Sequence, residues 1–167
     1  MDITSKMALR VFKYYKDLQP GDNNQILYIQ SVVHFTRLIA DGSGYYLYQT
    51  ELFELAALLH DIGSPTSIQI YGDNKPVHRQ AENRRIVTEW MANYDGISDE
   101  QKKWLIDVVG SISDADAAQE LRFQPLYEAI FLAKLASGSF KIENVLIYVD
   151  RFVKTAIGKK IFNTLIS

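Results

Sequence analysis

The chain has only three histidines, His34, His60 and His78, and they are the residues best suited to metal or acid–base chemistry. His34 lies inside a segment with helical periodicity, and His60 is followed directly by Asp61. His78 comes shortly after a proline, where a helix is expected to begin. A lone helical histidine is usually an ordinary polar or half-buried residue. The whole set is therefore interpreted together with its neighbours.

The pair His60-Asp61 ends an apolar segment that begins at Leu55. An aspartate directly after such a segment is costly unless it is paired or bound to a metal. Because neighbouring helical residues diverge by about 100°, both side chains can reach one ion beside the helix end. Imidazole and carboxylate together suit Zn²⁺, Mn²⁺ or Fe²⁺, and Mg²⁺ less naturally. The alternative is an aspartate in a turn and a histidine bonded to backbone.

A histidine in one helix and His-Asp-Ile-Gly at the end of the next resemble the HD superfamily of metal-dependent phosphohydrolases. The resemblance covers about residues 25–155. It implies a helical bundle around a metal site, with His34, His60 and Asp61 as ligands. His78 is similar to an additional histidine that some subgroups carry.

One position departs from the family pattern. A distal aspartate normally completes the ligand set, but Ala133 stands there in the matching segment, followed by Lys134 at the family's lysine. Alanine cannot bind a metal. Either Asp114 or Asp116 supplies the fourth ligand, or three protein ligands hold the ion together with water. A salt bridge in the bundle explains Lys134 equally well.

The resemblance implies hydrolysis of a phosphate ester. A divalent ion lowers the pKa of bound water and polarises a phosphoryl oxygen. Asp61 is then expected to ligate the ion and to orient the water. His78 is expected either to hold a second ion or to contact the phosphate. Arg37, Lys75 and Arg79 are candidate phosphate-binding residues, and for each of them a solvated charged face is the alternative.

The hydrophobic periodicity is helical almost throughout, which predicts one all-α, HD-like domain over residues 1–167 with about 7–8 helices. The predicted helices cover about residues 4–17, 23–40, 50–61, 77–93, 99–112, 124–136 and 140–156, with a short tail helix after Gly158. Thr50 is expected to cap the third of these, and Ser98 begins a capping box. Residues 63–76 are expected to form a loop that covers the pocket.

Composition excludes several classes of protein. The chain has 167 residues, of which 47% are hydrophobic and 23% charged, and its net charge is −2. It has no strong basic field, so a nucleic-acid partner is not expected. Its apolar runs are too short to span a membrane, and its first residues lack the apolar centre of a signal peptide. A cytoplasmic protein is expected, and the absence of cysteine does not decide the compartment.

Three functions remain open. The first is a phosphohydrolase that acts on a nucleotide or another small phosphate ester through a water activated by Mn, Fe, Zn or Mg. The second is a degenerate HD domain that binds a ligand or partner without hydrolysis, which Ala133 favours. The third is a helical interaction protein without a metal. The apolar tail after Phe152 can pack on a second copy of the chain or close the same bundle.

Overall fold

The computed structural model describes residues 1–112 and 123–167, and within these ranges it contains nine helices and no strand. The helices are α1 (Ile3–Leu18), α2 (Asn24–Gly42), α3 (Leu47–Leu59), α4 (Ser64–Tyr71), α5 (Pro76–Ala92), α6 (Asp99–Val109), α7 (Gln124–Ala136), α8 (Ile142–Phe152) and α9 (Ala156–Ile166). The predicted all-α class is confirmed, although the helices are more numerous than predicted. In these two ranges no helix has the length and apolar character needed to cross a membrane.

Two predicted helix starts have different outcomes. The capping box at α6 is confirmed, since Ser98 Oγ accepts from Gln101 N at 3.2 Å and Gln101 Oε1 accepts from Ser98 N at 2.8 Å. Thr50 does not cap α3, because that helix begins three residues earlier at Leu47. Thr50 is instead buried within α3, where its hydroxyl donates to Asp41 Oδ1 at 3.2 Å.

The segment predicted to be a loop over residues 63–76 contains the short helix α4. Pro65 lies in its first turn, where a missing N–H costs nothing. Gly72 ends it in the left-handed conformation, with φ of 74°, and donates to Ile68 O at 3.0 Å. The proline and glycine therefore mark the two ends of a helix and do not interrupt a loop.

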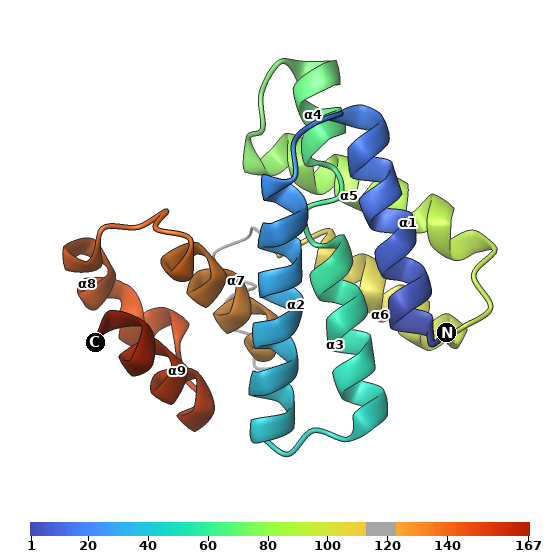
Figure 1. Ribbon diagram of the computed structural model, residues 1–167. Coiled ribbons are helices and arrows are strands. Elements are labelled where there is room, and N and C mark those ends of the chain that lie inside the picture. The colour runs from blue at the N-terminus through green and yellow to red at the C-terminus, as the bar shows by residue number, and fades with distance from the viewer. Residues whose placement is uncertain (113–122) are drawn as a thin grey trace.

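Helix α2 holds the two sides of the bundle together. It packs along α3 on one side and along α7 on the other, so that α7, α8 and α9 lie across α2 from α3 and α1 (Figure 1). One continuous apolar core runs through this arrangement, with Val32 and Ile39 from α2, Leu55 and Leu59 from α3, and Leu132 from α7. The core places the end of α3 beside the start of α2 and next to α7.

The buried carboxylate of Glu128 joins α7 to the start of α9. Its Oε1 accepts from Thr155 N, and its Oε2 accepts from the Thr155 hydroxyl, both at 2.6 Å. A carboxylate in this position complements the positive end of the helix dipole. Gly158 approaches so closely that a Cβ there would lie 2.6 Å from Glu128 Oε2. The apolar tail thus packs against its own bundle, with Phe162 buried.

Candidate functional site

The turn that follows α3 carries the His60-Asp61 pair, and the buried side chain of Asn83 fixes it. Asn83 Oδ1 accepts from Gly63 N at 2.6 Å, and Asn83 Nδ2 donates to His60 O at 2.7 Å and to Val109 O at 3.2 Å. A Cβ on Gly63 would lie 2.5 Å from Asn83 N and 2.8 Å from Arg79 O. Only glycine therefore lets this turn lie directly on the backbone of α5.

His60 is a buried, neutral imidazole. Its Nδ1 lies 2.7 Å from Ala57 O, and since a carbonyl oxygen only accepts, the proton is on Nδ1. Nε2 then accepts from the Tyr28 hydroxyl at 3.3 Å. Burial lowers the pKa of His60 and raises the pKa of Tyr28. Both groups therefore keep the protonation states that this pair of hydrogen bonds needs.

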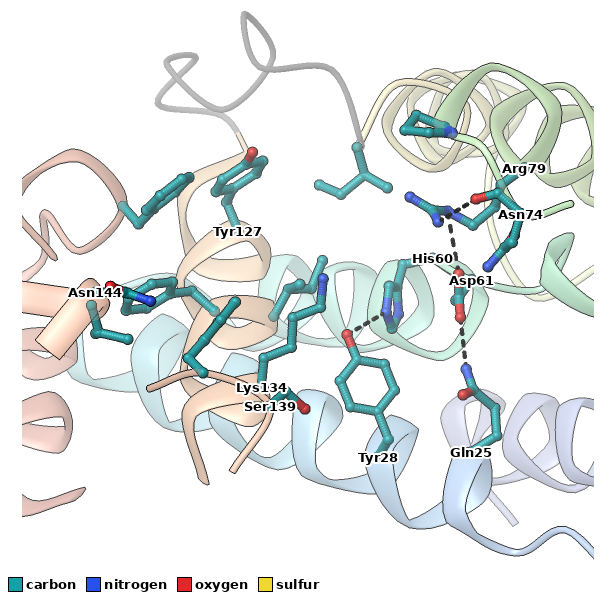
Figure 2. A pocket seen from close by; sticks show the side chains of 17 residues that line it. Gln25, Tyr28, His60, Asp61, Asn74, Arg79, Tyr127, Lys134, Ser139 and Asn144 are labelled. Atoms are coloured by element: carbon teal, nitrogen blue, oxygen red, sulfur yellow. Dashed lines mark hydrogen bonds and ion pairs between the residues drawn. The ribbon is translucent and has the colours of Figure 1, made fainter. Parts of the chain in front are cut away.

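Asp61 lies on the wall of the pocket with all of its oxygens engaged (Figure 2). Its Oδ2 accepts from Gln25 Nε2 at 2.7 Å, and its Oδ1 lies 3.4 Å from Arg79 Nε. Its backbone oxygen accepts from the Tyr15 hydroxyl at 2.6 Å. The Asp61 and Arg79 side chains are 18% and 22% exposed, so their ion pair is largely shielded from water.

The site opens into a cavity of about 770 Å³ between α2, α5, α7 and α8. Polar and charged side chains line one end: Gln25, Tyr28, His60, Asp61, Arg79 and Lys134. Tyr127 and Asn144 lie on the far side of the cavity from Asp61 and Arg79 (Figure 2). Aromatic rings line this far side. Tyr127 stacks on Phe152 at 5.7 Å between centroids, and Phe152 stacks on Phe131 at 5.2 Å. The cavity therefore has a charged end and an aromatic end.

Lys134 extends from α7 into this cavity (Figure 2). Its side chain remains in contact with solvent, while partial burial against the cavity wall lowers the pKa of its amino group. Arg79 lowers this pKa further, and Asp61 opposes the shift. Among the residues that the structure describes, no carboxylate forms an ion pair with Lys134.

His34 does not join His60 and Asp61, which corrects the expected ligand set. It is exposed on α2 and contacts the ring of Phe35, at 6.1 Å between centroids. Tyr28 on the same helix faces His60, and six further residues turn the helix by about 240° from that direction and advance it by about 9 Å. In residues 1–112 and 123–167, no three His, Asp or Glu side chains form a group that could hold a metal.

The described residues of the pocket do not fit a metal ion. The lone pair of His60 that a metal would take already accepts from Tyr28, and Asp61 accepts from Gln25 and pairs with Arg79. Ala133, which stands at the position of the family's distal aspartate and was therefore expected to face the pocket, is buried in the apolar core. The next residue on α7, Lys134, lines the cavity instead. The two other candidate ligands, Asp114 and Asp116, lie outside the described residues.

His78 belongs to a neighbouring cluster and does not line the pocket. Its Nδ1 lies 2.6 Å from Asp73 Oδ1, and its ring stacks on Tyr71 at 4.2 Å. Lys75 also pairs with Asp73, at 3.4 Å. A hydrogen bond from the Lys75 backbone and one from the His78 side chain lower the pKa of Asp73 to about 2. Of the residues expected to bind phosphate, Lys75 is therefore committed to this cluster, and only Arg79 faces the cavity.

Arg37 lies far along α2, away from the pocket. It pairs with Asp41 at 3.7 Å and with the buried Glu54 at 3.5 Å. Burial raises the pKa of Glu54, and Arg37 opposes that shift. The placement of Arg37 therefore agrees with the alternative interpretation, a charged helix face.

Three residues of the site were not expected from the sequence: Gln25, Tyr28 and Asn83. Gln25 and Tyr28 are three residues apart and so share one face of α2. Asn83 begins a buried row that continues with Ile86 and Val87. A polar residue at the start of such an i, i+3, i+4 row could have indicated burial, but a search for apolar periodicity does not include it.

Comparisons of the chain with models of known protein families, with curated proteins and with solved structures found no match.

Proposed function

We propose that this chain is a ligand-binding domain that holds a small organic phosphate in the cavity without a bound metal. The observation that carries the proposal is the charge of the cavity wall. Arg79 from α5 and Lys134 from α7 both line it, and Asp61 is the single carboxylate among its described lining residues. Because burial lowers the pKa of His60 and keeps it neutral, the described side chains at this end carry an excess of positive charge.

The start of α5 adds to the attraction for an anion. Pro76 and Arg79, both in its first turn, line the cavity. The residue at Lys75 makes no side-chain cap, and the first turn contains no acidic residue, although the Asp73 carboxylate just before the helix already accepts from Lys75 N at 3.0 Å. A helix start of this kind presents N–H groups and the positive end of the helix dipole. These features support a site for a phosphate group beside Arg79.

The other end of the cavity suits the organic part of the ligand. Stacked Tyr127, Phe152 and Phe131 offer flat apolar surface next to the polar side chain of Asn144. A cavity of about 770 Å³ is within the range of small-molecule sites. A nucleotide, with a planar base and a charged end, combines these properties, and it is the ligand that we propose.

Metal-dependent hydrolysis, implied by the HD resemblance, is the function from which this proposal departs. Hydrolysis would need ligands that the described residues do not bring together, because His60 and Asp61 are bonded to Tyr28, Gln25 and Arg79. The proposal keeps the other half of the resemblance, an anionic phosphate ligand beside the His60-Asp61 turn. One experiment separates the two functions.

The experiment measures binding by calorimetry with a panel of nucleoside monophosphates, in EDTA and then with Mn²⁺, Mg²⁺ or Co²⁺, together with phosphate release. We expect binding in EDTA, and no phosphate released under any condition. Arg79→Ala is expected to weaken binding by about 10–100-fold, because a charged hydrogen-bond donor is worth roughly 1.5–3 kcal/mol.

Arg84→Ala is the matched control. Arg84 is on the same helix and also pairs with an aspartate, Asp107 at 3.5 Å, but it does not line the cavity. Its variant should bind as tightly as the wild type. Metal-dependent release of phosphate would establish the hydrolase instead, and equal binding by the two arginine variants would exclude the cavity as the binding site.

A further inference from the structure

Lys134 is exposed to solvent and at the same time lines the cavity. Its amino group lies in a cavity, and within the described residues no ion pair holds it. Lys13, by contrast, pairs with Asp17 at 2.6 Å on the open surface of α1. An amine that is not committed to a carboxylate is available to react with a ligand.

The groups around Lys134 increase the share of its neutral, nucleophilic form. Partial burial and the positive charge of Arg79 both lower the pKa of Lys134, and the carboxylate of Asp61 opposes them. His60 and Tyr28, the other titratable groups described at this end, are neutral, because burial lowers the pKa of His60 and raises the pKa of Tyr28. Burial in a partly apolar pocket and a neighbouring cation are two known means of activating a lysine.

We propose that Lys134 forms an imine with a ligand that carries both an aldehyde and an anionic group. The amine nitrogen attacks the carbonyl carbon, and the carbinolamine that forms then loses water. One C=N bond thereby replaces the C=O bond, with no oxidation or reduction. The ligand class is a small phosphorylated or carboxylated aldehyde with a planar body.

The cavity offers each part of such a ligand a place. The anionic group lies beside Arg79, the planar body lies along the Tyr127 and Phe152 rings, and the carbonyl carbon lies at Lys134, which lines the same cavity. This inference rests on the proposed anion site at Arg79. The reactivity of Lys134 does not depend on that site, so the two can be tested separately.

The probe is pyridoxal 5′-phosphate, whose adduct is fixed by borohydride reduction and assigned by peptide mass spectrometry. The hydride reduces the C=N bond to a stable secondary amine. We expect Lys134 to be labelled several-fold faster at pH 7.5 than Lys160, a lysine on α9 that does not line the cavity, because a lowered pKa raises the neutral fraction of an amine. Equal rates at these two lysines within one sample would overturn the proposal.

Lys134→Arg, which keeps the charge but cannot form an imine, should lose the fast-labelled peptide while Lys160 reacts as before. Its fold is checked by circular dichroism, and the comparison of two lysines within the wild type does not depend on this variant.

Pyridoxal without its phosphate and the Arg79→Ala variant distinguish the two proposals. Fast labelling of Lys134 that neither change slows would keep the imine and remove the anion site. Tight binding of the probe without label at Lys134 would keep the anion site and remove the imine.

Discussion

Asn83 and Gly63 are joined by a 2.6 Å hydrogen bond from the glycine N–H to the asparagine side chain, and their backbones are so close that Gly63 has no room for a Cβ. The contact connects the turn after α3 to the middle of α5. Because His60 and Asp61 lie in that turn and Arg79 lies on that helix, the contact sets the distance between the two halves of the charged end of the cavity.

Asn83→Ala is expected to destabilise the protein by about 3 kcal/mol or more, because it leaves three buried backbone groups without their partner. Urea denaturation measures this change. Asn93→Ala, at the exposed end of the same helix, is the control and should cost within about 0.5 kcal/mol. A similar, small loss for both variants would show that the Asn83 bonds do not hold the turn.

Gly63→Ala is expected to cost about 2–3 kcal/mol, because the added methyl group meets backbone atoms of α5 that cannot rotate away. The variant should also bind organic phosphates more weakly, because the added methyl group pushes on the backbone of α5 at Arg79 and so displaces that residue. Gly21→Ala separates steric crowding from backbone strain. Gly21 has a φ of 90° but open space around it, so its substitution should cost about 1–2 kcal/mol and leave binding unchanged.

The stability of the fold is expected to fall with acid below about pH 6.5, the ordinary pKa of histidine. Burial lowers the pKa of His60, so below this pH the unfolded chain takes up a proton that the folded chain refuses. Each pH unit then removes at most about 1.4 kcal/mol, down to the lowered pKa of the folded state. Urea midpoints between pH 7.5 and 5.0 test this dependence.

In that experiment, His60→Gln is less stable at neutral pH but should show a flatter pH dependence than the wild type. His34→Gln removes an exposed histidine on α2 and serves as the control for loss of an imidazole at the surface. The same acid dependence in His60→Gln and in the wild type would contradict the assignment to His60.

Ala133→Asp introduces the carboxylate that the HD pattern has at this position. Since Ala133 is buried in the apolar core, the variant is expected to lose about 3 kcal/mol or more and to gain no affinity for Mn²⁺. Ala136→Asp, exposed on the same helix, should change stability by about 0.5 kcal/mol. Tight Mn²⁺ binding by a folded Ala133→Asp protein would show that this residue faces the site.

Local patterns along the chain predicted most of the helices and drew attention to the His60-Asp61 pair. An aspartate that directly follows an apolar run needs a partner, and Asp61 has two, Gln25 and Arg79. The identity of those partners could not be predicted. Gln25 and Tyr28 contact this pair only because α2 packs antiparallel to α3, and that packing depends on contacts distant in the sequence.

His34 and α4 show why the remaining features were not predicted. A ligand on α2 has to share the helix face of Tyr28, and the rotation of α2 about its axis is set by its packing against α3 and α7. The number of residues between His34 and the His60-Asp61 pair does not say which face of α2 carries His34. In α4, Pro65 and Gly72 are suited both to loops and to helix ends, and eight residues are too few for a clear apolar period.

Two stretches of chain supply all of the described cavity lining except Ile112, and this division affects how ligand preference can change. Residues 25–79 supply the wall around Asp61 and Arg79, whereas residues 127–152 supply all of the stacked rings. The side chain of Asn83, which holds the first stretch in place, forms its hydrogen bonds with Gly63, His60 and Val109, none of which belongs to those rings. On the proposed function, substitutions among the rings of α7 and α8 can therefore alter which organic group is accepted without disturbing Arg79, which lies on α5.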